Sequence, residues 1–211
     1  MLPLLAVAAL SCGGADARPS LRGAGGLIKI PTAYVSTGGS VAPHPEPGRP
    51  DETLTTLTYA VQDTAEVAVQ MLSEGTSTYN LKFQLSQDVS NRTQDSPAMA
   101  IGMLDQPEDG TEKAFYGVMS KRMEGSPMVF HLGVLSPGSL VGDLRPFGGF
   151  EVPLAPRFLA LGEYDGLQRD VNSGLEYYVS ANVASFMYLL DVGTRGLQAE
   201  SITGFTFRMA F

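Results

Sequence analysis

Short alternating segments separated by turn residues recur along the chain, and this rhythm limits the possible folds more than any other feature. In residues 79–86 (YNLKFQLS), the odd positions are apolar and the even positions are polar. Successive side chains of a β-strand point to opposite faces, so this segment has one apolar and one polar face. After Gly25, no segment shows the 3.6-residue apolar spacing of an amphipathic helix. The chain is therefore predicted to be all-β.

About twelve strands are expected, with ten to fourteen as the range, because turn formers interrupt the alternation at short intervals. The segment from Thr37 to Thr53 is rich in Gly and Pro and is predicted to be an exposed, mobile loop. The expected strands span residues 26–36, 54–62, 65–73, 78–87, 97–104, 112–121, 127–135, 146–152, 157–164, 172–180, 183–191 and 200–211.

Composition excludes several function classes. The net charge is −8, with 14 Lys and Arg against 22 Asp and Glu, so nucleic acid is not an expected partner. The single cysteine is Cys12 and the only histidines are His44 and His131, so neither a multi-histidine metal site nor thiol chemistry is expected. No metal and no cofactor are predicted.

The first 17 residues have the pattern of an export signal. An apolar stretch from Leu2 to Leu10 precedes Ala15-Asp16-Ala17, a small-x-small cleavage site. We expect cleavage after Ala17, which divides the chain into a signal peptide (1–17) and a barrel (18–211). A lipidated Cys12 and a buried apolar N-terminal segment are the alternatives. No other stretch approaches the length of about 20 apolar residues that a membrane helix needs.

The segment from Thr203 to Phe211 distinguishes a membrane barrel from a soluble β-sandwich, since both alternate. A bulky apolar face is favoured in lipid, where the strand edge must also be closed by pairing with the first strand. We expect Arg208 to point inward. The residues expected to face lipid are Phe205, Phe207, Met209 and Phe211.

On a barrel model, the polar face of each strand lines the interior. Charges of both signs there are expected to pair across the lumen and fill it, although a transport path is an alternative. The candidate lumen-facing residues are Glu66, Lys82, Gln84, Glu151, Glu163, Glu176 and Arg208.

No residue is assigned a catalytic role. His131 lies in the middle of an expected strand and is interpreted as a structural histidine, and His44 has no recognisable companion in its loop. Glu163 and Asp165 are close enough in sequence for acid and base work, but a strand end beside a turn explains them as well. The chain is expected not to be an enzyme.

Four short motifs are scattered over most of the chain after residue 17. They lie in residues 26–33 (GLIKIPTA), 147–151 (FGGFE), 161–166 (LGEYDG) and 172–177 (NSGLEY). These motifs resemble those of the YjbH-like outer-membrane barrels associated with exopolysaccharide production. The resemblance implies a bacterial outer-membrane barrel that exports or organises surface polysaccharide.

Three functions follow as hypotheses: a non-enzymatic outer-membrane barrel linked to exopolysaccharide, a small-solute porin or channel, and a soluble secreted β-sandwich that binds a ligand. The first implies outer-membrane lipid and the barrel-assembly machinery as partners, together with polysaccharide or its export proteins.

Overall fold

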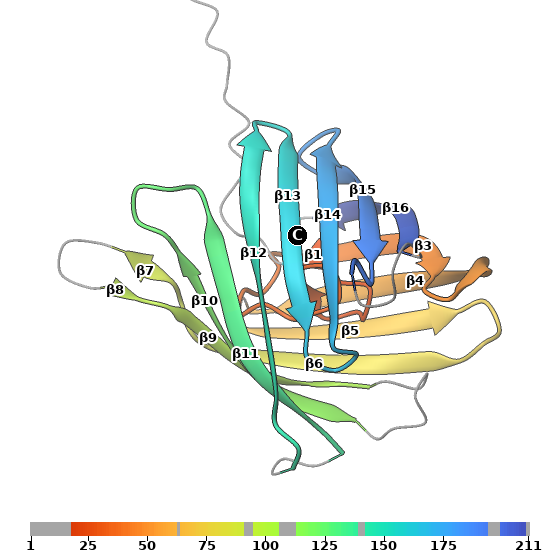
Figure 1. Ribbon diagram of the computed structural model, residues 1–211, viewed down its shortest axis with the longest axis horizontal. Coiled ribbons are helices and arrows are strands. Elements are labelled where there is room, and N and C mark those ends of the chain that lie inside the picture. The colour runs from red at the N-terminus through yellow and green to blue at the C-terminus, as the bar shows by residue number, and fades with distance from the viewer. Residues whose placement is uncertain are drawn as a thin grey trace, which may run out of the picture.

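The computed structural model describes residues 18–62, 64–90, 95–105, 113–138, 142–193 and 199–209. These residues form a closed antiparallel barrel of twelve strands, which confirms the predicted fold class (Figure 1). No helix in these ranges has the length and apolar character that a membrane-spanning helix requires. The barrel strands are β3 (Gly39–Glu46), β4 (Arg49–Val61), β5 (Ala65–Leu72), β6 (Ser77–Ser86), β9 (Ala98–Leu104), β10 (Ala114–Arg122), β11 (Val129–Pro137), β12 (Arg145–Ala155), β13 (Phe158–Asp165), β14 (Asp170–Tyr178), β15 (Val183–Leu190) and β16 (Glu200–Met209).

Each barrel strand pairs with the next one along the chain, and β16 closes the ring by pairing with β3. Two short strand pairs stand apart from this ring. β1 (Arg18–Pro19) pairs with β2 (Gly25–Gly26), and β7 (Val89–Ser90) pairs with β8 (Asp95–Ser96). The first pair lies inside the barrel and the second lies on the connection between β6 and β9.

Alternation along β5 and β6 sends polar side chains inward and apolar ones outward. In β6, the side chain of Lys82 is completely buried, whereas its neighbour Phe83 is 51% exposed. The same contrast separates Glu66 from Val67 in β5. A soluble protein has the reverse arrangement, because it buries its large apolar side chains away from water.

The first strand predicted from sequence is wrong. Residues 26–36 do not belong to the barrel wall but fold inside it, and the predicted loop 37–53 instead contains β3 and the start of β4. The partner of the closing strand is therefore β3. The other eleven predicted strands match β4–β6 and β9–β16, with ends that differ by five residues at most in the described part of the chain.

Two physical reasons explain this exchange. Residues 26–33 are buried on every side, so their apolar pattern resembles that of a buried strand. β3 contains Pro43 and Pro45, which lack a backbone N–H and therefore argue against a strand in a sequence-based analysis.

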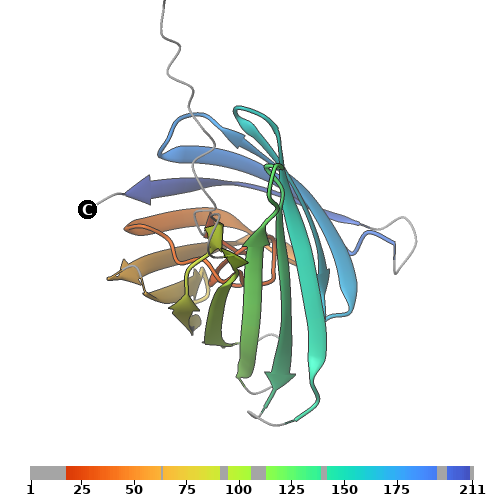
Figure 2. The ribbon, with the colours of Figure 1, turned by 90° about the vertical axis from the view of Figure 1, so that its left-hand side faces the viewer.

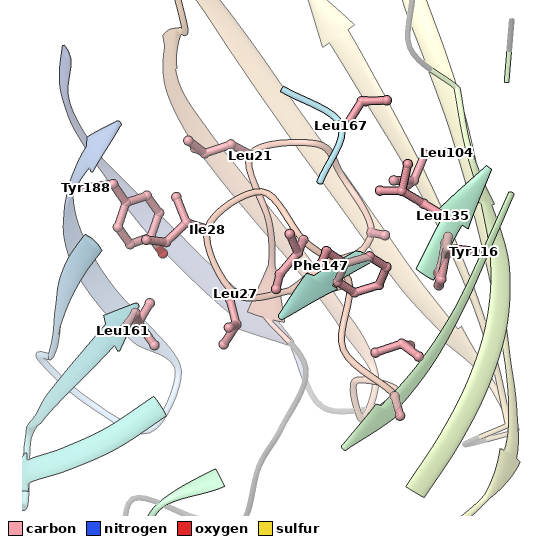
Figure 3. Packing of buried hydrophobic residues seen from close by; sticks show 14 of the residues in the cluster. Leu21, Leu27, Ile28, Leu104, Tyr116, Leu135, Phe147, Leu161, Leu167 and Tyr188 are labelled. Atoms are coloured by element: carbon pink, nitrogen blue, oxygen red, sulfur yellow. The ribbon is translucent and has the colours of Figure 1, made fainter. Parts of the chain in front are cut away.

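The apolar core lies between the inner wall and the segment inside the barrel. Figure 3 shows Leu27 and Ile28 of that segment among wall residues such as Leu161 and Tyr188. Leu27 and Ile28 are completely buried. The barrel is thus packed around a piece of its own chain.

Candidate functional site: the plug inside the barrel

Residues 18–36, called the plug segment below, run inside the barrel between β12–β14 on one side and β4–β6 on the other (Figures 1 and 3). Every residue from Arg18 to Ala33 is buried. Gly23 turns the segment with a φ of 94°, and a Cβ at this position would lie 2.5 Å from the side-chain nitrogen of Asn80. Glycine is therefore required where the plug segment approaches β6.

Arg18 is bound by two glutamates of the barrel wall. Its Nη2 lies 2.6 Å from Oε2 of Glu151, and its Nε lies 3.0 Å from Oε1 of Glu176. All three side chains are at most 7% exposed. Coulomb attraction is strong where water is excluded, and removal of one partner of such a buried pair typically costs about 3–5 kcal/mol.

Two further cations of the plug segment bind the same side of the barrel. Nη2 of Arg22 lies 2.6 Å from Oδ2 of Asp165, and Nζ of Lys29 lies 2.9 Å from Oδ2 of Asp170. Together these contacts define an acidic wall on β12–β14. The acidic wall consists of Glu151, Glu163, Asp165, Asp170 and Glu176.

Glu163 holds the plug segment through its backbone. Its carboxylate accepts hydrogen bonds from the N–H groups of Ile28 at 2.9 Å, Lys29 at 2.8 Å and Ile30 at 3.3 Å. The side-chain amide of Asn172 donates a fourth, at 2.9 Å. A tight turn leaves these N–H groups without a backbone acceptor, and a buried donor without a partner costs free energy. Glu163 therefore fixes the conformation of this turn.

The opposite wall holds the plug segment through Glu66 and Lys82, whose side chains lie 3.3 Å apart. Lys82 donates to the carbonyl oxygens of Gly25 at 2.7 Å and Tyr34 at 2.6 Å. Glu66 accepts from the N–H of Gly25 and from the hydroxyl of Ser36. The two charges thus satisfy both the donors and the acceptors of the plug backbone.

Two amides complete this side. Nε2 of Gln70 donates to the carbonyl oxygen of Leu21, and Nδ2 of Asn80 donates to that of Arg22, each at 2.7 Å. Both wall side chains are buried. Backbone carbonyls of the plug segment are therefore paired with wall amides where no strand partner exists.

Ser120, His131 and Glu151 form a chain of contacts across three neighbouring strands. The Ser120 hydroxyl lies 2.7 Å from Nδ1 of His131, whose Nε2 lies 3.6 Å from Oε1 of Glu151. This order of side chains resembles that of an acyl-transfer site. However, Ser120 and His131 are completely buried, Ser120 accepts the N–H of Ala33, and the ring of Tyr34 makes a T-shaped contact with that of His131, with centroids 6.0 Å apart. The arrangement anchors the plug segment.

Asp88, between β6 and β7, fastens the end of the plug segment from outside the strands. It accepts hydrogen bonds from the hydroxyl of Tyr34, from Nζ of Lys121 and from the N–H of Arg122. Partial burial acts to raise the pKa of Asp88, but these hydrogen bonds outweigh it and hold the pKa below its ordinary value. The carboxylate therefore stays ionised at neutral pH.

The structure brings five of the seven candidate lumen residues into contact with the plug segment. Gln84 and Arg208 are only half-buried, and the guanidinium of Arg208 lies over the ring of Tyr178. Phe205, Phe207 and Met209 are exposed on the outer surface, and Phe211 lies outside the described residues. The five lumen residues at the plug are Glu66, Lys82, Glu151, Glu163 and Glu176.

Sequence reasoning missed the cations of the plug segment and about half of the wall side chains that contact it. A cluster of glycines at 23, 25 and 26 next to Arg22 and Lys29 was the available signal, because glycines and cations are unusual together in a barrel strand. The ion-pair partners of these cations could not be predicted, since they lie more than 130 residues away in sequence. His131 was considered only as a structural histidine and Asp165 only beside Glu163 at a strand end. The residues that sequence reasoning missed are Arg18, Arg22, Lys29, Gln70, Asn80, Ser120, Asp170 and Asn172.

Among the described residues, no group of three or more His, Cys, Asp or Glu side chains is placed to hold a metal ion. Comparison of the chain with protein-family models, with curated proteins and with solved structures found no match.

Proposed function

We propose that this protein is a non-enzymatic β-barrel of the bacterial outer membrane whose lumen is closed by the plug segment. The apolar outer surface carries the proposal. Exposed large hydrophobic side chains come from eleven of the twelve barrel strands, all except β3. Soluble proteins rarely expose apolar patches larger than a few hundred Å², whereas a band of this kind around a barrel is favoured in hydrocarbon.

The closed ring also supports a membrane location. Hydrocarbon offers no partner for backbone N–H and C=O groups, so only structures without a free edge are stable in it. The strands are 7 to 13 residues long, which brackets the length of about 9–11 residues that a tilted membrane strand needs. In this proposal, the signal peptide 1–17 directs export, and Phe205, Phe207 and Met209 face lipid.

Fractionation of the native bacterium tests the location. We expect the protein in the outer-membrane fraction, with faster gel migration of the unheated form because a folded barrel resists detergent. Recovery wholly in the soluble periplasm would contradict the proposal.

The plug segment supports a closed barrel rather than an open porin. Planar-bilayer recordings separate the two functions. The intact protein should give no discrete conductance steps, whereas a variant that lacks residues 18–36 should give them. Regular steps from the intact protein would favour the small-solute channel instead.

The family resemblance supports a role in exopolysaccharide export or organisation. Its four motifs lie far apart in sequence but meet in the structure. Residues 26–33 form the turn held by Glu163, and the other three motifs contribute the acidic wall residues Glu151, Asp165 and Glu176. The motifs thus describe one feature, the plug and the wall that binds it.

Gene deletion in the native bacterium tests this role. We expect less surface polysaccharide, restored by the wild-type gene and by the control variant Gln84→Ala. Unchanged surface polysaccharide after deletion would remove exopolysaccharide from the proposal and leave the membrane barrel untouched.

A further inference from the structure

A small cavity lies at one end of the barrel, between the plug segment and the connections of the wall strands. Pro47 of the β3–β4 turn, Leu72 at the end of β5 and Gln168 of the β13–β14 turn line it. In Figure 2, β16 ends at the label C, and the turn between β13 and β14 lies at the opposite end of the barrel. Gln168 is exposed, so the cavity opens to solvent.

The size of the cavity limits what it can hold. Its volume is about 40 Å³. One water molecule needs about 10–15 Å³ in the same measure, so the cavity has room for about three atoms of the size of oxygen. A ligand can therefore place a few polar atoms inside while its remainder extends into solvent.

Arg22 of the plug segment lines the cavity with an unused donor. Its Nη2 lies 2.6 Å from Oδ2 of Asp165, whereas Nη1 is buried without a hydrogen-bond partner among the described residues. The Arg22 side chain is only 9% exposed. A guanidinium carries five N–H donors, and a buried donor without an acceptor costs free energy. A ligand that brings an acceptor oxygen relieves this cost.

The charges around the cavity disfavour an ion. Arg22 and Lys29 line it, but Asp165 and Asp170 compensate their charges at 2.6 and 2.9 Å. Asp105, which is half-buried, adds a further carboxylate to the lining. An anion would be repelled by Asp105 and a cation by Arg22 and Lys29. A neutral ligand is therefore favoured.

The lining combines donors, acceptors and apolar groups. Nζ of Lys29 donates two of its three hydrogens to neighbouring side chains, so one remains beside those on Nη1 of Arg22. Asp105 supplies acceptor oxygens. A hydroxyl group both donates and accepts, so it matches either kind of partner. Leu21 and Leu54, both buried, form an apolar part of the lining that suits C–H groups.

We propose that this cavity binds neighbouring hydroxyl groups of a neutral saccharide. One hydroxyl accepts from Arg22, and the next donates to Asp105. A sugar ring holds its hydroxyls in fixed positions, so binding costs less conformational entropy than it does for a flexible polyol. The inference goes beyond the proposed function, because it needs the plug segment inside the barrel but neither a membrane location nor a role in exopolysaccharide.

Nuclear magnetic resonance titration of the purified protein in detergent micelles measures binding. D-glucose, D-galactose and D-mannose are the neutral probes, and inorganic phosphate and methylammonium are the charged ones. At least one sugar should shift the signals of Arg22 and Asp105 and saturate with a Kd on the order of 1 mM, because few of its atoms are buried. The charged probes should bind at least about tenfold more weakly than that sugar, because like charges repel them.

Substitutions locate the site. Asp105→Ala and Arg22→Met should each weaken binding of the sugar at least about tenfold. Asp143→Ala and Arg49→Met are the matched controls and should leave the Kd unchanged, because both residues lie at the same end of the barrel but outside the cavity lining. Asp105→Ala keeps the ion pairs of the plug segment, so it tests the site even where Arg22→Met fails to fold.

The absence of saturable shifts at Arg22 and Asp105 with all three sugars would overturn the saccharide site. Shifts that persist unchanged in Asp105→Ala would overturn its location. Saturation by phosphate or methylammonium alone would overturn a neutral ligand. None of these outcomes changes the fractionation or gene-deletion results expected above, so failure of the saccharide site is distinguishable from failure of the proposed function.

Discussion

The acidic wall on β12–β14 and the seam between β3 and β16 keep the same barrel closed by different means. The acidic wall combines ladders of seven and eight residue pairs with buried ion pairs to the plug segment. Among the described residues, the seam has a ladder of three residue pairs, two prolines in β3, and an exposed contact in which the carboxylate of Glu200 accepts the N–H of Gly48. The difference teaches that ion pairs are concentrated where the plug is held, whereas the strands at the seam are joined by few paired residues.

Loss of an ion pair at the acidic wall should have the largest effect. Arg18→Met leaves Glu151 and Glu176 buried with less compensation, and we expect the free energy of unfolding to fall by about 3–5 kcal/mol. Urea unfolding in detergent micelles measures it. Arg208→Met is the control, because that guanidinium is half-buried over Tyr178, and it should cost at most about 1 kcal/mol. Equal losses in both variants would contradict a special role for the acidic wall.

Glu163→Gln should have the next largest effect. The amide keeps the shape of the carboxylate but loses its charge and turns an NH₂ group toward plug N–H donors. We expect a loss of about 2 kcal/mol, measured in the same unfolding experiment. Glu52→Gln, in β4 and with an ion pair to the exposed Arg49, should change stability by less than about 0.5 kcal/mol. A loss no larger than this control would show that Glu163 does not hold the plug turn.

Glu200→Gln should act only on the seam. Because the contact between the Glu200 carboxylate and the Gly48 N–H is exposed, we expect a loss of about 0.5 kcal/mol or less, with exchange of the Gly48 amide accelerated about threefold. Hydrogen exchange resolved by residue measures this change. Glu74→Gln, in the turn between β5 and β6, should leave Gly48 unaffected. Faster exchange throughout the acidic wall would contradict the expectation that this substitution affects only the seam.

Acid should loosen the end of the plug segment at Asp88. The pKa of this carboxyl is lower in the folded protein than its ordinary value, so its stabilisation is complete above about pH 4 and is lost as the pH falls through the folded pKa. The Tm difference between wild type and Asp88→Asn should therefore shrink between pH 7 and pH 3. A difference that stays constant over this range would contradict the hydrogen bonds assigned to Asp88.

Most of the barrel wall was predictable from sequence because alternation reports local burial. The side chains of Lys82 and Phe83 differ in polarity and point to opposite faces, as the period of two requires. The expected count of twelve strands agrees with the structure because two errors compensate. Residues 26–36 were counted as a wall strand, and β3 was assigned to a loop. Alternation cannot separate a wall strand from a segment buried inside the wall.

The plug contacts were not predictable because they depend on the closed three-dimensional arrangement. Glu163 was expected to face the lumen, and the structure gives it three backbone N–H donors 133 to 135 residues away. No local pattern encodes such a partner. His131 was interpreted as a structural histidine, and its contact with Ser120 depends on the register of β10 with β11.

A disulfide between Ala33→Cys and Ser120→Cys, formed in isolated outer membranes with Cys12 replaced by Ser, tests the plugged membrane barrel most directly. The N–H of Ala33 lies 2.8 Å from the Ser120 hydroxyl, so mild oxidation should cross-link this pair. Ala33→Cys with Phe130→Cys, whose side chain is exposed on the outer surface, should not react. A cross-link in the membrane fraction of the first pair alone is the predicted result. Absence of the protein from that fraction, or equal reaction of both pairs, would contradict a plug held inside a membrane barrel.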